Sequence, residues 1–263
     1  MAMTAALRGA GFEHGMDASA TVRSLCSGPE PSSASSFHPA LAVPQTTISS
    51  QRGLGFRITS NDAVKAVRDY NRGSYRGRMN VDLDREAYNR FRKGLSNELD
   101  ELANQIAFVG EQYGGAQERF LPHAVRVEAV LIARNLHGVI DQWLKAVTEA
   151  KPLIEDVPDE GTLKSLFSPF TATKQWGVWA SKTLHFLRPD AFPILDSNAK
   201  KPLGLRHLVG SSRDYHQFCF HLRNVLLANS DALAAARAAD NLESPTDLKL
   251  LDKVLYQLGL RMK

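Results

Sequence analysis

Two neighbouring blocks decide the fold of this chain: G-V-W-A-S-K-T-L-H-F-L-R at residues 177–188 and F-P-I-L-D-S-N-A-K-K at residues 192–201. The first block begins with a glycine turn that leads into a helix. The second is an apolar run that ends at Asp196. Aspartate is a preferred N-cap, because its side chain accepts hydrogen bonds from backbone N–H groups at the start of a helix. Taken alone, the second block therefore predicts a buried apolar turn followed by an Asp-capped helix.

The order and spacing of the two blocks are similar to the helix-hairpin-helix and Gly/Pro...Asp core of a DNA glycosylase superfamily. Adenine mismatch glycosylases of this superfamily carry a G-V-G hairpin, a helix and then F-P-I-L-D-G-N-V-K-R, whose aspartate is the catalytic carboxylate. The chain matches F-P-I-L-D at all five positions, and then matches Asn198 and Lys200, within roughly thirty of its 263 residues. The resemblance implies an all-α, two-lobed domain with a central cleft and Asp196 as the catalytic carboxylate.

The chain departs from these relatives at three places. Trp179 replaces the second glycine of the hairpin. The connection from His185 to Asp196 is about three residues shorter than in the relatives. Pro202 falls where the helix after the aspartate normally continues.

A second comparison concerns cleavage of the DNA strand, which requires a lysine that forms a Schiff base with the sugar. Archaeal 8-oxoguanine glycosylases carry K-E-A-S-H-F-L-R before their own aspartate motif. Alignment on His185-Phe186-Leu187-Arg188 places Ser181, and not Lys182, at the catalytic lysine of that family. We therefore expect base excision without efficient strand cleavage, with Lys182 as the candidate lysine if the enzyme is bifunctional.

The resemblance also assigns the residues that contact DNA and the target base. The Gly177-Val178 turn is expected to hold a phosphate at a helix N-terminus, and Trp179 either displaces this contact or intercalates. The target base must leave the duplex and enter a pocket. Aromatic residues are the candidates for this pocket, although a core role is the more common one for each: Trp143, Trp176 and Phe192. The other candidates for DNA binding are Ser181, Lys200, Lys201, Arg72, Arg76 and Arg78.

The charge of the chain is compatible with a polyanionic partner. Its net charge is +4 and its pI is about 9.1. Residues 64–93 hold nine Lys or Arg residues against four acids, with interleaved aromatic residues. Such a cluster can neutralise phosphates, or it can be a solvated helix face with ion pairs between successive turns. Both interpretations stay open.

Composition excludes several other classes of protein. A hydrophobic fraction of 43% and a charged fraction of 23% are ordinary for a soluble globular protein, and no apolar run reaches the length of a membrane span. The two cysteines, Cys26 and Cys219, are too few for a four-cysteine iron–sulfur or zinc site. We expect no metal and no cofactor, and a cytoplasmic location.

The chain divides near residue 54. Residues 1–54 are rich in Ser, Ala and Gly, contain four prolines and lack an apolar period, so we expect a disordered N-terminal extension. Residues 55–263 carry almost only helical signals. We expect helices at about 60–70, 95–109, 137–149, 212–228, 230–240 and 246–258, no hairpin of strands, and a subdomain junction near 150–160. The helix at 124–136 is apolar nearly all round and is expected to be the buried central helix.

Three functions remain open. The first is a DNA glycosylase, expected to be monofunctional, that acts on a damaged, mismatched or modified base in base excision repair or in defence against modified foreign DNA. The second is a non-catalytic DNA-binding or protein-interaction module on the same scaffold. The third is a generic helical protein with an accidental local match.

Overall fold

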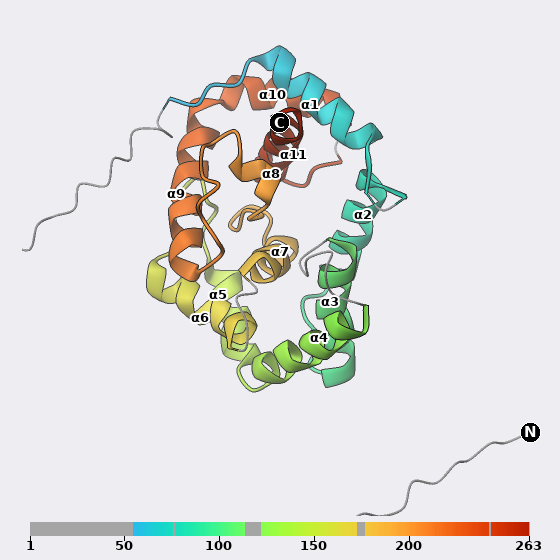
Figure 1. The fold of residues 1–263 in the computed structure, drawn as a ribbon. Coiled ribbons are helices and arrows are strands. Elements are labelled where there is room, and N and C mark those ends of the chain that lie inside the picture. Colours follow the sequence, from blue (N-terminus) through green and yellow to red (C-terminus); the bar gives the residue numbers. More distant parts are fainter. Residues whose placement is uncertain (1–54, 76, 114–121, 173–176, 242, 263) are drawn as a thin grey trace, which may run out of the picture. The chain divides into compact units, whose positions relative to one another are not determined.

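The chain is all-α, as the sequence predicted. The structure, a computed structural model, describes residues 55–75, 77–113, 122–172, 177–241 and 243–262. These residues belong to one compact unit, 48–263 (Figure 1). The predicted disordered extension at 1–54 and two candidate site residues, Arg76 and Trp176, lie outside the described residues.

The described residues form eleven helices and one short pair of strands. The elements are α1 Ser60–Arg72, β1 Ser74–Tyr75, β2 Arg78–Met79, α2 Asn80–Phe91, α3 Leu99–Gln112, α4 Pro122–His137, α5 Ile140–Glu149, α6 Glu160–Thr171, α7 Gly177–Leu187, α8 Ser197–Lys200, α9 Ser212–Ala228, α10 Ser230–Ala239 and α11 Asp247–Arg261.

The strands β1 and β2 are antiparallel, with Tyr75 opposite Arg78. The prediction that the chain has no strand hairpin is therefore wrong. The turn between the strands contains Gly77 at φ +79°, a conformation that glycine adopts without steric cost. Two residues per strand are too few to produce the alternating pattern by which a sequence reveals a hairpin.

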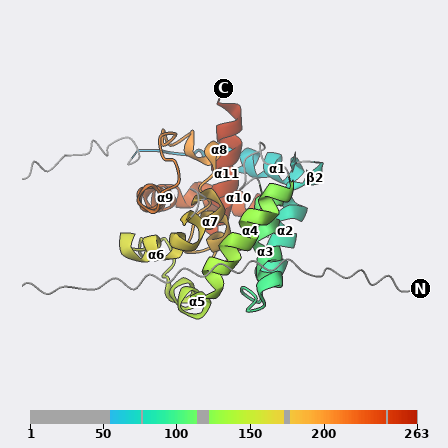
Figure 2. The same cartoon turned by 60° about the horizontal axis from the view of Figure 1, so that its bottom comes forward.

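The central helix is α7, and the prediction that the helix at 124–136 is central is wrong. In α7, nine of the eleven residues are buried, and the helix contacts α2, α3, α6 and α9. The ribbon shows it in the middle of the surrounding helices (Figures 1 and 2). In α4, by contrast, Val127 and Val130 are 46% and 36% exposed. The helix of the first sequence block is thus the core of the fold.

The sequence analysis did not name α6, the helix that precedes α7. Asp159 caps it and accepts a hydrogen bond from Thr162 N at 2.9 Å. Its buried residues Leu163, Leu166, Phe167 and Phe170 follow the helical spacing of three and four residues. Helices α6 and α7, which lie on either side of residues 173–176 in the sequence, pack against each other.

Helix α11 runs past the glycine that was expected to end it. Gly259 lies inside α11, where a Cβ atom would overlap the carbonyl oxygen of Asn198 and lie 2.6 Å from its carbonyl carbon. This glycine therefore permits close contact between α11 and α8. Helix α11 therefore packs directly against α8, the helix that Asp196 caps.

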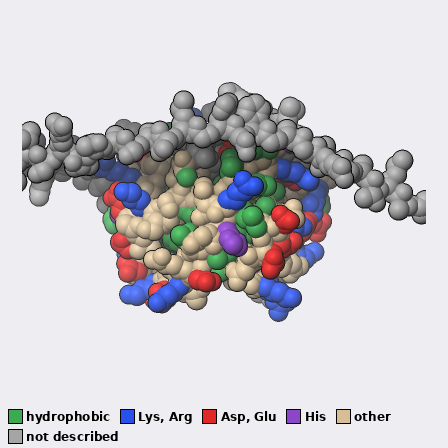
Figure 3. All heavy atoms as spheres, turned by 90° about the horizontal axis from the view of Figure 1, so that it is seen from below, with side chains coloured by type: hydrophobic (Ala, Val, Ile, Leu, Met, Phe, Trp, Pro, Cys, Tyr) green, Lys and Arg blue, Asp and Glu red, His purple; other side chains and the backbone are tan. Residues whose placement is uncertain are grey.

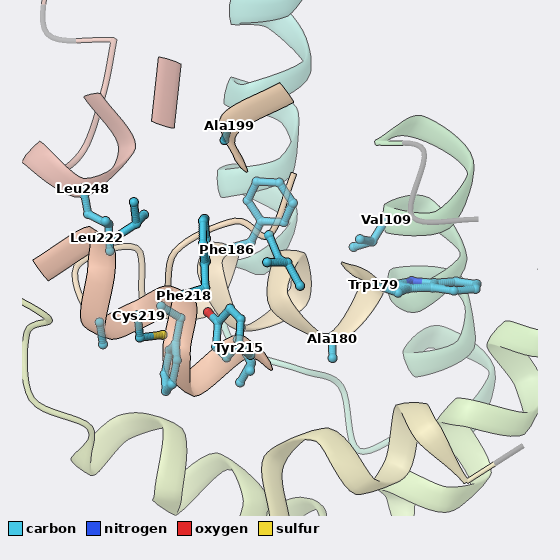
Figure 4. Close-up of a cluster of buried hydrophobic side chains, with 14 of the residues drawn as sticks. Val109, Trp179, Ala180, Phe186, Ala199, Tyr215, Phe218, Cys219, Leu222 and Leu248 are labelled. Carbon is cyan, nitrogen blue, oxygen red and sulfur yellow. The ribbon is translucent and has the colours of Figure 1, made fainter. Parts of the chain in front are cut away.

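The hydrophobic core surrounds α7 on several sides. Trp179 extends from α7 toward Val109 of α3, whereas Tyr215 and Phe218 of α9 pack on another side (Figure 4). The indole N–H of Trp179 donates to Ile106 O at 2.8 Å. A Cβ atom on Gly110 would lie 2.5 Å from the same ring, so Gly110 makes room for the indole.

Candidate active site around Asp196

Asp196 is the N-cap of α8. Its Oδ1 accepts a hydrogen bond from Asn198 N at 2.7 Å, as the simplest interpretation of the sequence predicted. The residue is only half-buried. Within the described part of the chain, the second carboxylate oxygen accepts no hydrogen bond. Asp196 therefore caps a helix and also presents one oxygen that is available to a ligand.

The segment before Asp196 is fixed from α7 by two side chains. Ser181 Oγ accepts a hydrogen bond from Leu195 N at 3.1 Å, and His185 Nδ1 donates to Phe192 O at 2.7 Å. Both donors and acceptors are buried. The two sequence blocks thus form one unit, in which the first block sets the position of the second.

The same segment is held from its other side by α9. Tyr215, which is fully buried, donates its hydroxyl hydrogen to Pro193 O at 2.7 Å. Hydrogen bonds from α7 and α9 therefore reach three backbone positions within four residues. Asp196 follows this rigid segment directly, and such a support is what a positioned catalytic carboxylate needs.

His185 is a neutral, buried histidine. Burial, followed by the nearby charge of Lys249, lowers its pKa to about 3. Because Nδ1 faces a carbonyl oxygen, Nδ1 carries the hydrogen, and Nε2 accepts the hydroxyl hydrogen of Tyr88 at 2.7 Å. His185 therefore links α2, α7 and the segment that leads to Asp196.

This histidine predicts how stability changes with pH. The unfolded chain protonates His185 near pH 6.5, whereas the native chain protonates it only near pH 3. Above about pH 6.5 the titration of His185 therefore does not change the free energy of unfolding. Between about pH 6.5 and pH 3 the free energy of unfolding falls by about 1.4 kcal/mol for each pH unit of acidification, because the unfolded chain binds a proton that the native chain does not. Urea unfolding from pH 7 to pH 4.5 should show this fall in the wild type. His185→Asn, which keeps a donor but does not titrate, should show a shallower fall, and equal slopes would contradict the assignment.

The start of α7 is packed against the loop before α9. A Cβ atom on Gly177 would overlap Gly210 O and lie 2.5 Å from the carbonyl carbon of Gly210. Gly210 itself has φ +108°. Close backbone contact, and not an open turn, is therefore the observed role of Gly177. Val178, the next residue of the expected phosphate-binding turn, is half-buried.

A buried polar cluster lies between α1, α2, α3 and α11. It consists of Tyr70, Asp84, Tyr113, Lys249 and Asp252. Lys249 Nζ lies 3.2 Å from Asp84 Oδ1 and 3.1 Å from Asp252 Oδ2. The hydroxyls of Tyr70 and Tyr113 donate to Asp84 at 3.1 and 3.3 Å. Lys249 and Asp84 are at least 96% buried, so an ion pair and its tyrosine partners replace apolar packing here.

Both sequence blocks border this polar cluster. Lys182 of α7 donates to Tyr113 O. The Asp196 charge contributes to the raised pKa of Asp252, whose main cause is burial. Burial is also the main cause of the raised pKa of Tyr256, and the Asp196 charge contributes to it. Asp196 thus stands at the edge of the cluster.

The structure corrects several of the predicted contacts with DNA and base. Trp179 and Ser181 are fully buried, so neither reaches a DNA strand: Trp179 packs against α3 and Ser181 holds Leu195. Trp143 and Phe192 are core residues with exposures of 3% and 0%. The indole N–H of Trp143 donates to Leu166 O at 2.9 Å. In this structure these four side chains are therefore packed within the protein and are not presented at its surface.

The predicted lysines bind the protein itself. Lys182 is 5% exposed. Lys200 is 9% exposed and donates to Leu208 O at 2.5 Å. Burial lowers the pKa of Lys200. Lys201, which is half-buried, donates to Asn198 Oδ1 at 2.8 Å. Lys200 and Lys201 therefore support the loops around Asp196, and Lys200 is engaged inside the protein.

The basic region divides into two parts. Arg78 pairs with Glu86 at 2.5 Å, and Arg90 pairs with the same carboxylate at 3.3 Å, as expected for a solvated ion-pair face. Arg72 is exposed and lies on one face of α1 with Lys65 and Arg68, at spacings of four and three residues. For these three residues the described chain provides no ion pair. The α1 stripe is thus one part of the region available to a polyanion, and Arg92 and Lys93, which are also exposed, are another.

On another face of the molecule, neither positive nor negative side chains predominate. Viewed from below, positive, negative and apolar side chains are interspersed (Figure 3). This is the face on which α4 and α5 lie in Figure 1. A nucleic-acid surface, which gathers cations, is better supported on α1 than on this face.

Sequence reasoning missed the polar cluster. Its α11 members, Lys249 and Asp252, lie on one polar face of the helix with Lys253, a pattern that normally indicates solvent exposure. The structure buries this face and the opposite apolar face alike. Helix α11 is packed on both faces. In the sequence, the only sign of this packing is the short apolar run Leu250-Leu251 between charged residues.

Comparisons of the chain with protein-family models, with curated proteins and with solved structures found no match. None of the described helices has the length and apolar character that crossing a membrane requires. In the same residues, no group of three or more His, Cys, Asp or Glu side chains is placed to hold a metal ion.

Proposed function

We propose that the chain is a DNA glycosylase that hydrolyses the N-glycosidic bond of a damaged, mismatched or modified base and leaves the strand intact. The observation that carries the proposal is the position of Asp196. Its half-exposed carboxylate follows a segment that Ser181, His185 and Tyr215 hold at three backbone positions. The exposed basic stripe on α1 supports a polyanionic partner.

The chemistry assigned to Asp196 is electrostatic. When the bond between C1′ and the base nitrogen breaks, the electron pair leaves with the base and positive charge develops on the sugar. A carboxylate beside C1′ stabilises this charge and accepts the proton of the water that adds to C1′. In Asp196, Oδ1 accepts the capping hydrogen bond from Asn198 N, and Oδ2 is the oxygen assigned to the sugar and the water.

Excision without strand cleavage is proposed because the lysines of the two sequence blocks nearest to Asp196 are engaged within the protein. Ser181 stands at the position aligned with the catalytic lysine of the 8-oxoguanine enzymes, and Lys182 donates to Tyr113 O on the α3 side of α7. Lys200 donates to Leu208 O and is buried.

The test is an abasic-site assay on duplexes that carry deaminated, oxidised, alkylated, mismatched or otherwise modified bases. Asp196→Asn retains an N-cap but loses the charge, so base release should fall about 100-fold without a change in unfolding temperature. Asp159→Asn, the same substitution at the N-cap of α6, is the matched control and should leave base release unchanged. Borohydride should trap no covalent complex.

One observation favours the second candidate, a non-catalytic DNA-binding or partner-binding module. The turn that should hold a phosphate is packed against Gly210. A wild type that binds duplex DNA but releases no base from any substrate supports this candidate and contradicts the glycosylase. Equal activity of Asp196→Asn and wild type excludes Asp196 as the catalytic group.

A further inference from the structure

The most exposed large apolar side chain among the described residues belongs to Val209, which is 68% exposed. It lies in the 204–211 loop, which connects α8 to α9. An exposed apolar side chain on a mobile loop would need no explanation. This loop, however, is rigidly built, as the next contacts show.

The carboxylate of Asp214 holds the loop from α9. Its Oδ2 accepts hydrogen bonds from the backbone N–H groups of Val209, Gly210 and Ser211 at 3.0, 3.2 and 3.3 Å. Burial alone would raise the pKa of Asp214, but these N–H groups lower it. Ser211 completes a capping box with Asp214. Val209 is therefore presented on a preformed support.

The loop also contacts both parts of the candidate site. Gly210 packs against Gly177 at the start of α7. Lys200 donates from α8 to Leu208 O at 2.5 Å, and the charge of Asp196 acts on the same ammonium. Val209 thus projects next to the two sequence blocks and not from a remote part of the surface.

Two arginines flank Val209 in the sequence, three residues before it and four residues after it. Arg206 and Arg213 are exposed, and no ion pair joins either of them to another described residue. The nearest carboxylate in sequence, Asp214, is already engaged by three backbone N–H groups. A protein partner generally requires a broader apolar patch with few charges at its centre. A single apolar tip between cations instead fits a polyanion with a stacked apolar interior.

We propose that the 204–211 loop is a duplex-DNA contact in which Val209 enters the base stack, while Arg206 and Arg213 contact the flanking phosphates. Apolar wedges of this kind unstack a base step and widen access to the nucleotide beside it. The DNA partner rests on the proposed function, and the loop adds the means by which the target base leaves the stack.

The test measures unstacking separately from base release. A duplex with 2-aminopurine beside the target base is titrated with wild type, Val209→Ser and the control Val139→Ser, which changes a 45% exposed valine between α4 and α5. Wild type and Val139→Ser should raise the fluorescence. Val209→Ser should bind about tenfold more weakly, as expected when one valine is no longer buried, and should lose most of the fluorescence rise.

A second variant tests the phosphate contacts. Arg206→Ala/Arg213→Ala should reduce the slope of log binding constant against log salt by about 2, and an unchanged slope overturns the assigned contacts. Equal binding and unstacking by Val209→Ser and wild type overturns the wedge, even if base release is intact. Val209-dependent unstacking without base release supports the wedge and contradicts only the glycosylase function.

Discussion

Gly177→Ala is expected to lower the free energy of unfolding by at least about 3 kcal/mol, because overpacking of a rigid backbone contact is costly. The new methyl group would overlap the carbonyl oxygen of Gly210. Both partners are backbone, so no side chain can rotate away. The helix α7 is the core of the fold, and a shift of its first residue would displace the supports of Asp196 as well. Urea unfolding followed by circular dichroism measures the change.

The control for this prediction is Gly138→Ala. A Cβ atom at Gly138 would meet no atom within 4 Å, so the free energy of unfolding should stay within about 0.5 kcal/mol of the wild type. A Gly177→Ala protein as stable as Gly138→Ala would show that the contact between α7 and the 204–211 loop yields easily. The packing described for the start of α7 would then be incorrect.

Lys249→Met should lower the free energy of unfolding by about 3–5 kcal/mol, the cost of removing one partner from a buried ion pair. Methionine preserves much of the aliphatic volume, but it leaves Asp84 and Asp252 without their shared cation. Burial alone would lower the pKa of Lys249, yet the charges around it, Asp84 first, raise it well above its usual value. The ammonium is therefore charged throughout the neutral range.

Thermal and urea unfolding of Lys249→Met provide the measurement, with Lys145→Met as the control. Lys145 pairs with Glu149 at 3.8 Å, and both side chains are at least 66% exposed, so this variant should change stability by less than about 1 kcal/mol. The Lys249→Met/Asp84→Asn variant should recover part of the loss. If Lys249→Met were as stable as Lys145→Met, the polar cluster would be hydrated and would contribute little to stability.

Local signals in the sequence predicted some helix ends well, whereas α3 begins at Leu99 and not near 95, and α5 begins at Ile140 and not near 137. The boundaries of α9 were predicted to the residue, because the Ser211 capping box signals its start. The start of α11 was predicted to within one residue, since Thr246 caps it. Asp196 was likewise predicted as an N-cap. Each of these features depends on residues fewer than five positions apart.

Burial was harder to predict, as the comparison of α4 with α7 illustrates. Helix α7 contains Ser181, Lys182, Thr183 and His185, polar and charged residues that do not by themselves indicate a buried helix. Each of these side chains has a hydrogen-bond partner. For example, the hydroxyl of Thr183 donates to Trp179 O at 3.1 Å. Buried polar groups with partners are tolerated, but no hydropathy pattern reveals them.

The candidate site shows the same limit. Its central carboxylate and the segment before it lie within one short motif, so the sequence was sufficient to find them. Among the pocket residues expected from aromatic type alone, Trp143 and Phe192 lie in the core, and the indole of Trp143 has its hydrogen-bond partner, Leu166 O, 23 positions away. The polar cluster joins Asp84 to Lys249, a pairing that only tertiary structure discloses.

The close contact between Gly259 and Asn198 has a consequence for biosynthesis. Helix α11 leaves the ribosome about sixty residues after the carboxylate that it helps to position, which corresponds to several seconds at ~5–20 residues per second. During this interval a nascent chain carries Asp196 on a helix that lacks its neighbour. The contact between α8 and α11 can therefore form only after translation has passed Gly259.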